Sequence, residues 1–150
     1  MRGNPYFETA ATWNEAEALL TFRPLRPRHT EGFELQSLRV HVRDHKRREL
    51  PAGERSLEAH YGAFVLSQAR KGREEARRLA LDVQYGSAPR ATRIAGHEAR
   101  VYELGPEPAP QDPDGRSPAV VAWHDGELFF LIASGELPSD ALVRIAESLY

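Results

Sequence analysis

The feature that most constrains this fold lies at residues 119–133, where two apolar runs flank one turn signal. Asp125-Gly126 is the strongest short-range signal for a two-residue type I′ turn, which joins neighbouring antiparallel strands. Pairing outward from this turn places Trp123 opposite Leu128. Because side chains alternate between faces, one face is predicted to carry Val121, Trp123, Leu128, Phe130 and Ile132, and the other Val120, Ala122, Phe129 and Leu131. A hairpin that is apolar on both faces belongs in the middle of a sheet with cover on each side.

A helix is predicted near each end of the chain. Thr12-Trp13-Asn14-Glu15 has the form of a capping box, in which the threonine hydroxyl and the glutamate carboxylate satisfy backbone N–H groups of the first turn. Ser139 is placed to cap the closing helix, and Asp140 suits its positive end. That helix has an apolar stripe at helical spacing, formed by Leu142, Ile145, Ala146 and Leu149. The stripe is expected to pack on the sheet.

Alternating apolar residues predict the remaining strands. The cleanest alternation is at 79–85, after a polar loop at 71–78, and Gly96-His97 is expected to join the two strands that follow. Gly62-Ala63 marks either a tight hairpin or a kink in one long strand, and the hairpin is favoured. A change of apolar phase near Gln36-Ser37 is expected to form a β-bulge. The predicted strands are 33–43, 57–61, 64–68, 79–85, 92–95 and 98–104, and 105–118 is expected to be an exposed loop.

Length and composition indicate one folded α+β domain at 1–150, with a core from about residue 12 to 150 and a flexible N-terminal segment at 1–11. Its mostly antiparallel sheet has about seven strands, with the N-terminal and C-terminal helices packed on one side. A net charge of -2 argues against nucleic acid as a partner, and the absence of cysteine excludes disulfides and thiolate sites. No signal peptide or membrane span is predicted. The chain is therefore either a complete intracellular protein or a domain separated from an upstream anchor.

Three segments carry a family resemblance, namely residues 94–102, 121–129 and 145–149. In order and spacing they resemble an uncharacterised bacterial extracytoplasmic domain, found at the C-terminal end of anti-sigma-factor-like membrane proteins and in lipoproteins. The resemblance runs from about Thr12 to the end of the chain. It implies a curved, half-barrel-like sheet with helices along one side, as in periplasmic lipoprotein carriers and stress sensors. It also implies a place in the bacterial envelope.

One cluster of metal-type ligands occurs at residues 41–45, which read His-Val-Arg-Asp-His. On a strand, His41 points to the same side as Arg39 and Arg43, whose positive charges oppose a bound cation. A solvated strand end is therefore preferred to a metal site.

Two other motifs are weaker. Asp112-Pro113-Asp114-Gly115 is similar to part of a calcium loop, but the ligating glutamate would fall at Trp123, so an Asp-rich turn is preferred. Ser134 lacks the G-x-S-x-G elbow of a serine nucleophile. No catalytic triad can be assembled from the sequence.

A basic run, Lys46-Arg47-Arg48, is flanked by Arg43 and Arg55 and could touch anionic lipid headgroups. Nearby carboxylates dilute its charge, so a charged hairpin loop is the preferred interpretation.

Since no catalytic motif is found, the sequence is interpreted as a non-enzymatic regulatory or sensory binding module. The family resemblance implies a link to an anti-sigma-type system and a protein partner or an envelope-derived ligand. Two helices can cover one side of the hairpin, so the second apolar face needs sheet curvature, a partner or an apolar ligand as its cover. Closure of the sheet on its own side chains is the preferred cover. The alternative function is a carrier of lipid or another apolar ligand on the concave face. The sequence assigns no catalytic, cofactor-binding or metal-binding residue, and it leaves the ligand-binding residues and the compartment open.

Overall fold

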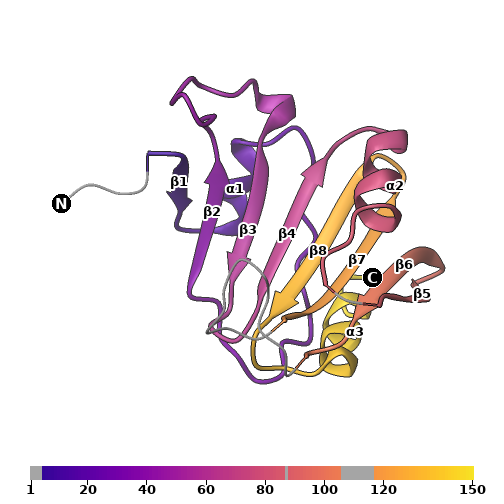
Figure 1. Ribbon diagram of the computed structural model, residues 1–150. Helices are drawn as coiled ribbons and strands as arrows, with labels where there is room; N and C mark the ends of the chain where they lie inside the picture. Colours follow the sequence, from indigo (N-terminus) through magenta and orange to yellow (C-terminus); the bar gives the residue numbers. More distant parts are fainter. Residues whose placement is uncertain (1–4, 87, 106–116) are drawn as a thin grey trace.

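The computed structural model describes residues 5–86, 88–105 and 117–150, which form an open, curved, half-barrel-like sheet with helices on both faces (Figure 1). Neighbouring strands are antiparallel, and the strand order is β1-β2-β3-β4-β8-β7-β6-β5. The described strands are β1 (Phe7–Ala10), β2 (Ser37–His41), β3 (Ser56–His60), β4 (Val65–Arg70), β5 (Arg90–Ile94), β6 (His97–Tyr102), β7 (Ala119–Asp125) and β8 (Leu128–Ser134). The described helices are α1 (Trp13–Ala18), the 3₁₀ turn η1 (Ala52–Glu54), α2 (Arg73–Leu81) and α3 (Ser139–Glu147). The predicted α+β architecture is confirmed, with eight described strands where about seven were expected.

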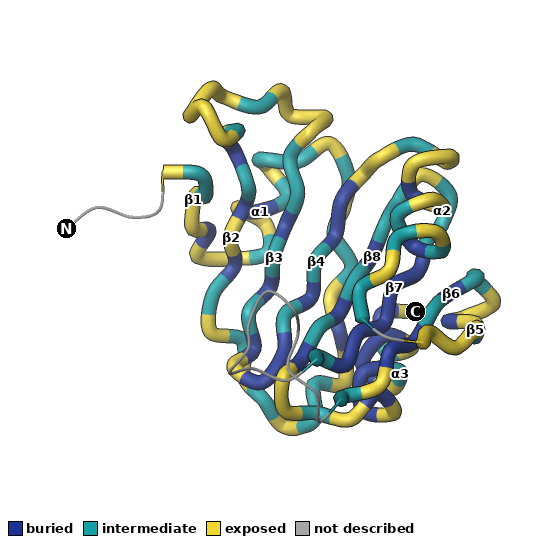
Figure 2. Tube along the Cα trace, in the orientation of Figure 1, coloured by how far each residue is buried: buried dark blue, intermediate teal, exposed yellow. Residues whose placement is uncertain are grey.

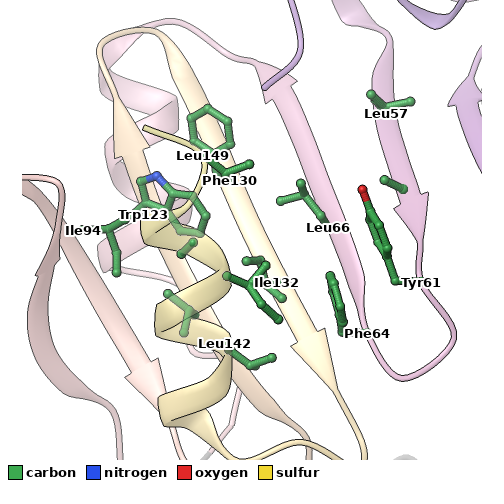
Figure 3. Close-up of a cluster of buried hydrophobic side chains, with 14 of the residues drawn as sticks. Leu57, Tyr61, Phe64, Leu66, Ile94, Trp123, Phe130, Ile132, Leu142 and Leu149 are labelled. Atoms are coloured by element: carbon green, nitrogen blue, oxygen red, sulfur yellow. The ribbon is translucent and has the colours of Figure 1, made fainter. Parts of the chain in front are cut away.

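The main hydrophobic core lies between α1, α3 and one face of the sheet, which we call the inner face. Trp123 and Phe130 are neighbours across β7 and β8, are fully buried, and stack with ring centroids 5.0 Å apart. The predicted stripe of α3 covers them, since Leu142 and Ile145 are also fully buried (Figure 3). One unbroken apolar row crosses the inner face from Leu38 on β2 to Val121 on β7, and the next row is apolar except at Gln68. The helices at both ends of the chain therefore close one core.

The two faces of the central hairpin are as predicted, but its turn is displaced by one residue. Asp125 pairs with Leu128 and Trp123 pairs with Phe130, so the turn is Gly126-Glu127. Only the first turn residue has a positive φ, +59° at Gly126, which fits a type II′ turn and not the expected type I′. Each residue of β7 therefore pairs two residues further along β8 than expected. Because two is an even number, every side chain stays on its predicted face.

The segment after β4 corrects the sequence prediction most strongly. Residues 71–78 and 79–85 were expected to be a loop and a strand, but α2 runs from Arg73 to Leu81. Its buried positions are Ala76 and Ala80, four residues apart, and both are fully buried. Since small side chains mark this packing stripe, hydrophobic periodicity did not detect it, whereas the alternating large residues at its end imitated a strand.

α2 covers the second apolar face of the hairpin, which we call the outer face. Val120, Ala122 and Tyr102 are buried there, on strands that α2 contacts. The sequence favoured closure of the sheet on its own side chains as the cover of this face, and that expectation is wrong. The cover is a third helix packed against β6, β7 and β8.

Smaller differences occur near the N-terminal end. The capping box forms, because the Glu15 amide donates to the Thr12 hydroxyl at 3.1 Å and the Glu15 carboxylate accepts from the Ala11 amide at 2.8 Å. β1 lies within the segment 1–11 and adds an edge strand that the sequence did not predict. β2 begins at Ser37, so the expected bulge near Gln36-Ser37 is absent from the ladder with β3.

Of the other predicted turns and caps, one turn is confirmed, one turn is displaced, and the predicted cap of α3 is wrong. Gly62-Ala63 joins β3 to β4 in a hairpin, the alternative that the sequence favoured. The turn between β5 and β6 is Ala95-Gly96, one residue before the expected position. Ser139 does not cap α3: the N-cap is Pro138, and the Ser139 hydroxyl donates to Glu103 at 2.6 Å.

Candidate functional site

The outer face is apolar under α2, and it is polar over β2, over β3 and at Ser67 of β4. Cross-strand pairing places Arg39, Glu58 and Ser67 in one row of this face. His60 lies beside them, with Nε2 2.9 Å from Oε1 of Glu58. We call this surface the polar half of the outer face; it consists of Ser37, Arg39, His41, Ser56, Glu58, His60 and Ser67. None of the α-helices α1, α2 and α3 packs on it, since α1 and α3 lie on the inner face and α2 lies on β6 to β8.

A hollow of about 820 Å³ lies where the polar half meets the ends of β3 and β4. One wall is η1 with the preceding loop, and the other is the start of α2 with the residues just before it. We call it the strand-end hollow. Its chemistry is set by His41, Glu54, Ser56, Arg70, Lys71 and Glu75. Because three side chains are basic types and two are acidic, the lining suits a polar ligand that carries both kinds of charge.

Two charged residues of the hollow are fixed by the protein itself. Arg70 donates to the carboxylate of Glu127 at 2.8 Å and to the carbonyl of Thr21 at 3.1 Å. Glu75 forms an ion pair with Arg78, and the hydrogen bond from that guanidinium lowers the pKa of the Glu75 carboxyl. These contacts hold the charges in place before any ligand arrives, which reduces the entropic cost of binding.

The chemistry at the floor of the hollow comes from two cross-strand neighbours, His41 and Ser56. The His41 ring stacks on Phe7, with centroids 5.0 Å apart. The arrangement offers hydrogen-bond donors and acceptors for recognition.

The candidate metal ligands at residues 41–45 do not converge on one point in the structure. His41 faces the hollow, whereas Asp44 accepts hydrogen bonds from the amides of Lys46 and Arg48 and from the Arg48 guanidinium. Those bonds lower the pKa of the Asp44 carboxyl, with the Arg48 amide as the largest cause. Among the residues that the structure describes, no group of three His, Cys, Asp or Glu side chains could hold a metal ion.

The remaining predicted candidates take structural positions. The Ser134 hydroxyl is buried; it donates to the Ala63 carbonyl at 2.6 Å and accepts from the amides of Glu136 and Leu137. The basic run 46–48 lies in the exposed loop after β2. The Asp-rich motif at 112–115 lies outside the described residues, as does most of the predicted loop at 105–118.

Two polar features of the structure were not predicted from the sequence. The Trp123 indole donates to the Tyr150 hydroxyl at 3.0 Å, and burial raises the pKa of Tyr150 to about 12. On the outer face, Nε2 of His124 is buried without a hydrogen-bond partner among the described residues, and desolvation lowers the pKa of this histidine. The sequence shows that His124 lies beside a tight turn, but it does not show that α2 packs close to this histidine and buries it.

Comparison of the chain with protein-family models, with curated proteins and with solved structures finds no match. In the described part of the chain, no helix combines the length and the hydrophobicity needed to cross a membrane.

Proposed function

We propose that this chain is a non-enzymatic regulatory or sensory binding module of the bacterial envelope, linked to an anti-sigma-type system, and that it recognises an envelope-derived ligand or a protein partner at the strand-end hollow. The observation that carries the proposal is this hollow of about 820 Å³ with a mixed-charge, pre-fixed lining. The envelope context is taken from the family resemblance of residues 94–102, 121–129 and 145–149.

The mixed lining narrows the ligand chemistry. Lys71 lies two residues before the start of α2, and the acidic Glu54 lines the hollow from η1. A ligand with carboxylate and amino groups can satisfy both walls, and soluble fragments of the bacterial cell wall carry both groups. The proposal is therefore directed to a peptide-bearing cell-wall fragment.

The alternative function, a carrier of lipid on the concave face, receives less support. Trp123 and Phe130, the large aromatics of the inner face, are fully buried beneath α3. The strand-end hollow is lined by other, mostly polar residues. The carrier function stays a prediction, for which native mass spectrometry of protein purified from cells should reveal a lipid adduct.

Gly53→Trp tests the proposed site directly. Gly53 lines the hollow, and a Cβ atom built at this position meets no atom within 4 Å, so an indole is expected to fill the space without unfolding the chain. Gly135→Trp is the matched control, because Gly135 has the same open surroundings in the turn after β8 and does not line the hollow.

The measurement is isothermal titration calorimetry with purified soluble muropeptides. Wild type and Gly135→Trp are expected to bind equally, and Gly53→Trp is expected to lose binding. Equal binding by all three proteins, or no binding by wild type, would contradict the proposed site. For the regulatory role, a gene context with neither an upstream membrane segment nor a neighbouring sigma factor would count against the link to an anti-sigma-type system.

A further inference from the structure

The edge strand β5 offers unpaired backbone groups at the margin of the sheet. It pairs with β6 on one side, and Arg90, Ala91 and Arg93 are exposed (Figure 2). Its other side faces no strand in the described structure. At this margin, a further strand could join the sheet.

The tight turn fixes which backbone groups point outward. Ala95 and Gly96 both have positive φ angles, +48° and +86°, so Ile94 and His97 form the hydrogen-bonded pair that closes a two-residue hairpin. Bonded and non-bonded pairs alternate along an antiparallel ladder, so the next outward-facing residues are Arg93 and Ala91. Each presents one N–H donor and one carbonyl acceptor away from β6.

The side chains beside this edge are mainly basic. The Arg93 guanidinium donates to the Gly96 carbonyl at 2.8 Å, and that of Arg100 donates to the Ala99 carbonyl at 3.0 Å. Neither arginine forms an ion pair within the described residues, in contrast to Arg90, which lies 3.3 Å from a Glu103 carboxylate oxygen.

A hollow of about 340 Å³ lies beside this edge. Arg93 and Arg100 line it together with Ala91, Thr92 and a single carboxylate, that of Glu98. The two guanidinium groups therefore leave an excess of positive charge next to the outward backbone groups.

We propose that β5 binds an extended acidic peptide segment of a partner protein as an added strand. The backbone of Ala91 and Arg93 supplies the strand hydrogen bonds, while Arg93 and Arg100 pair with carboxylates on alternate residues of the peptide. This surface is separate from the strand-end hollow, so the inference goes beyond the proposed function.

Charge favours an acidic partner over a second copy of this chain. Pairing β5 with β5 of another copy would bring the arginines of both strands together, and like charges across a strand pair are destabilising. Arginine on an edge strand also discourages unselective pairing, which leaves the edge available to a segment of opposite charge.

The probe is a short capped peptide in which glutamate alternates with valine, and the control peptide carries lysine in place of glutamate. Binding is followed by ¹⁵N-resolved chemical shifts and by fluorescence anisotropy at two salt concentrations. We expect the acidic peptide to shift the amides of Ala91 and Arg93, with affinity that falls as salt is raised. The lysine peptide is expected not to bind.

Four variants separate the contribution of the backbone hydrogen bonds from that of the arginine charges. Ala91→Pro removes an outward donor and leaves the β6-facing groups intact, so it is expected to abolish binding. Arg93→Glu is expected to weaken binding on the order of tenfold, about 1.4 kcal/mol. Arg39→Glu makes the same charge change on the polar half of the outer face and is expected to bind like wild type. Gly53→Trp is also expected to bind normally, so this test does not depend on the outcome at the strand-end hollow.

The inference is overturned if wild type binds neither peptide, if both peptides bind alike, or if Ala91→Pro binds as wild type does. Self-association in sedimentation velocity that Ala91→Pro removes would also overturn it, because a second copy would then occupy the edge. Chemical-shift changes confined to residues far from β5 would also overturn it, because the peptide would then bind at another surface.

Discussion

Gln68 is a polar residue in the middle of the core, and its removal tests how the long segment between α1 and β2 is held. It lies on the inner face between Leu57 and Phe130 in one cross-strand row, and it is 1% exposed. Its amide bridges the backbone of Leu25: Oε1 accepts from the N–H at 2.7 Å, and Nε2 donates to the carbonyl at 2.7 Å. We expect Gln68→Leu to destabilise the protein.

The magnitude follows from the two backbone groups that lose their partner. An unsatisfied buried group costs about 1–3 kcal/mol, so two would cost about 2–6 kcal/mol. Leu25 is only partly buried, and water can reach some of its backbone after the substitution. Leucine has a volume similar to that of glutamine and adds no cavity. The expected loss in free energy of unfolding is therefore about 2–3 kcal/mol.

Urea unfolding followed by tryptophan fluorescence measures this loss, since Trp123 is fully buried in the same core. Ser67→Ala, at the neighbouring residue on the outer face, is the control and is expected to change stability by less than about 0.5 kcal/mol. Gln68→Glu keeps the acceptor but buries a carboxylate, so its stability is expected to improve in acid, where a protonated carboxyl can donate to Leu25. If Gln68→Leu lost less than about 0.5 kcal/mol, the bridge would not hold this segment.

Three further predictions concern the other buried groups. Desolvation lowers the pKa of His124, so this histidine binds a proton less readily in the folded protein than in the unfolded chain. The free energy of unfolding is therefore expected to fall as the pH drops below about 6.5, and chemical denaturation at several pH values should show a smaller fall for His124→Leu. Ala80→Leu is expected to cost about 1–3 kcal/mol by forcing α2 off the sheet, while exposed Arg73→Leu changes melting little, as measured by circular dichroism. Ser139→Ala removes the main cause of the lowered Glu103 pKa, so NMR titration should show that carboxyl moving up towards its usual 4.5; an unchanged midpoint would contradict this assignment.

How much of the fold was predictable depends on how each element is stabilised. The faces of the central hairpin and the stripe of α3 were predicted, because large apolar residues at fixed spacing record which side is buried. The capping box of α1 was predicted because it is a contact between residues three apart. In contrast, the turn at Gly126-Glu127 was displaced, since either of two glycine-containing pairs could close the hairpin.

The candidate sites depend on placement in three dimensions. The strand-end hollow combines residues from 21 to 75, and its walls exist only because η1 and α2 end up on either side of β4. α2 itself could not be recognised from large hydrophobic residues, since it packs through Ala76 and Ala80. The basic edge at β5 likewise requires knowing that β5 is the last strand of the sheet.

Local periodicity was enough to predict a hairpin buried on both faces, a terminal helix with an apolar stripe, and an α+β domain with a mostly antiparallel sheet. The three-dimensional packing was needed to learn which helix covers the outer face, which strands form the edges, and that Gln68 finds its partners at Leu25, 43 residues away in the chain. The physical reason is that burial leaves a periodic record along each element, whereas pairing between distant elements is chosen by the packing of the whole chain.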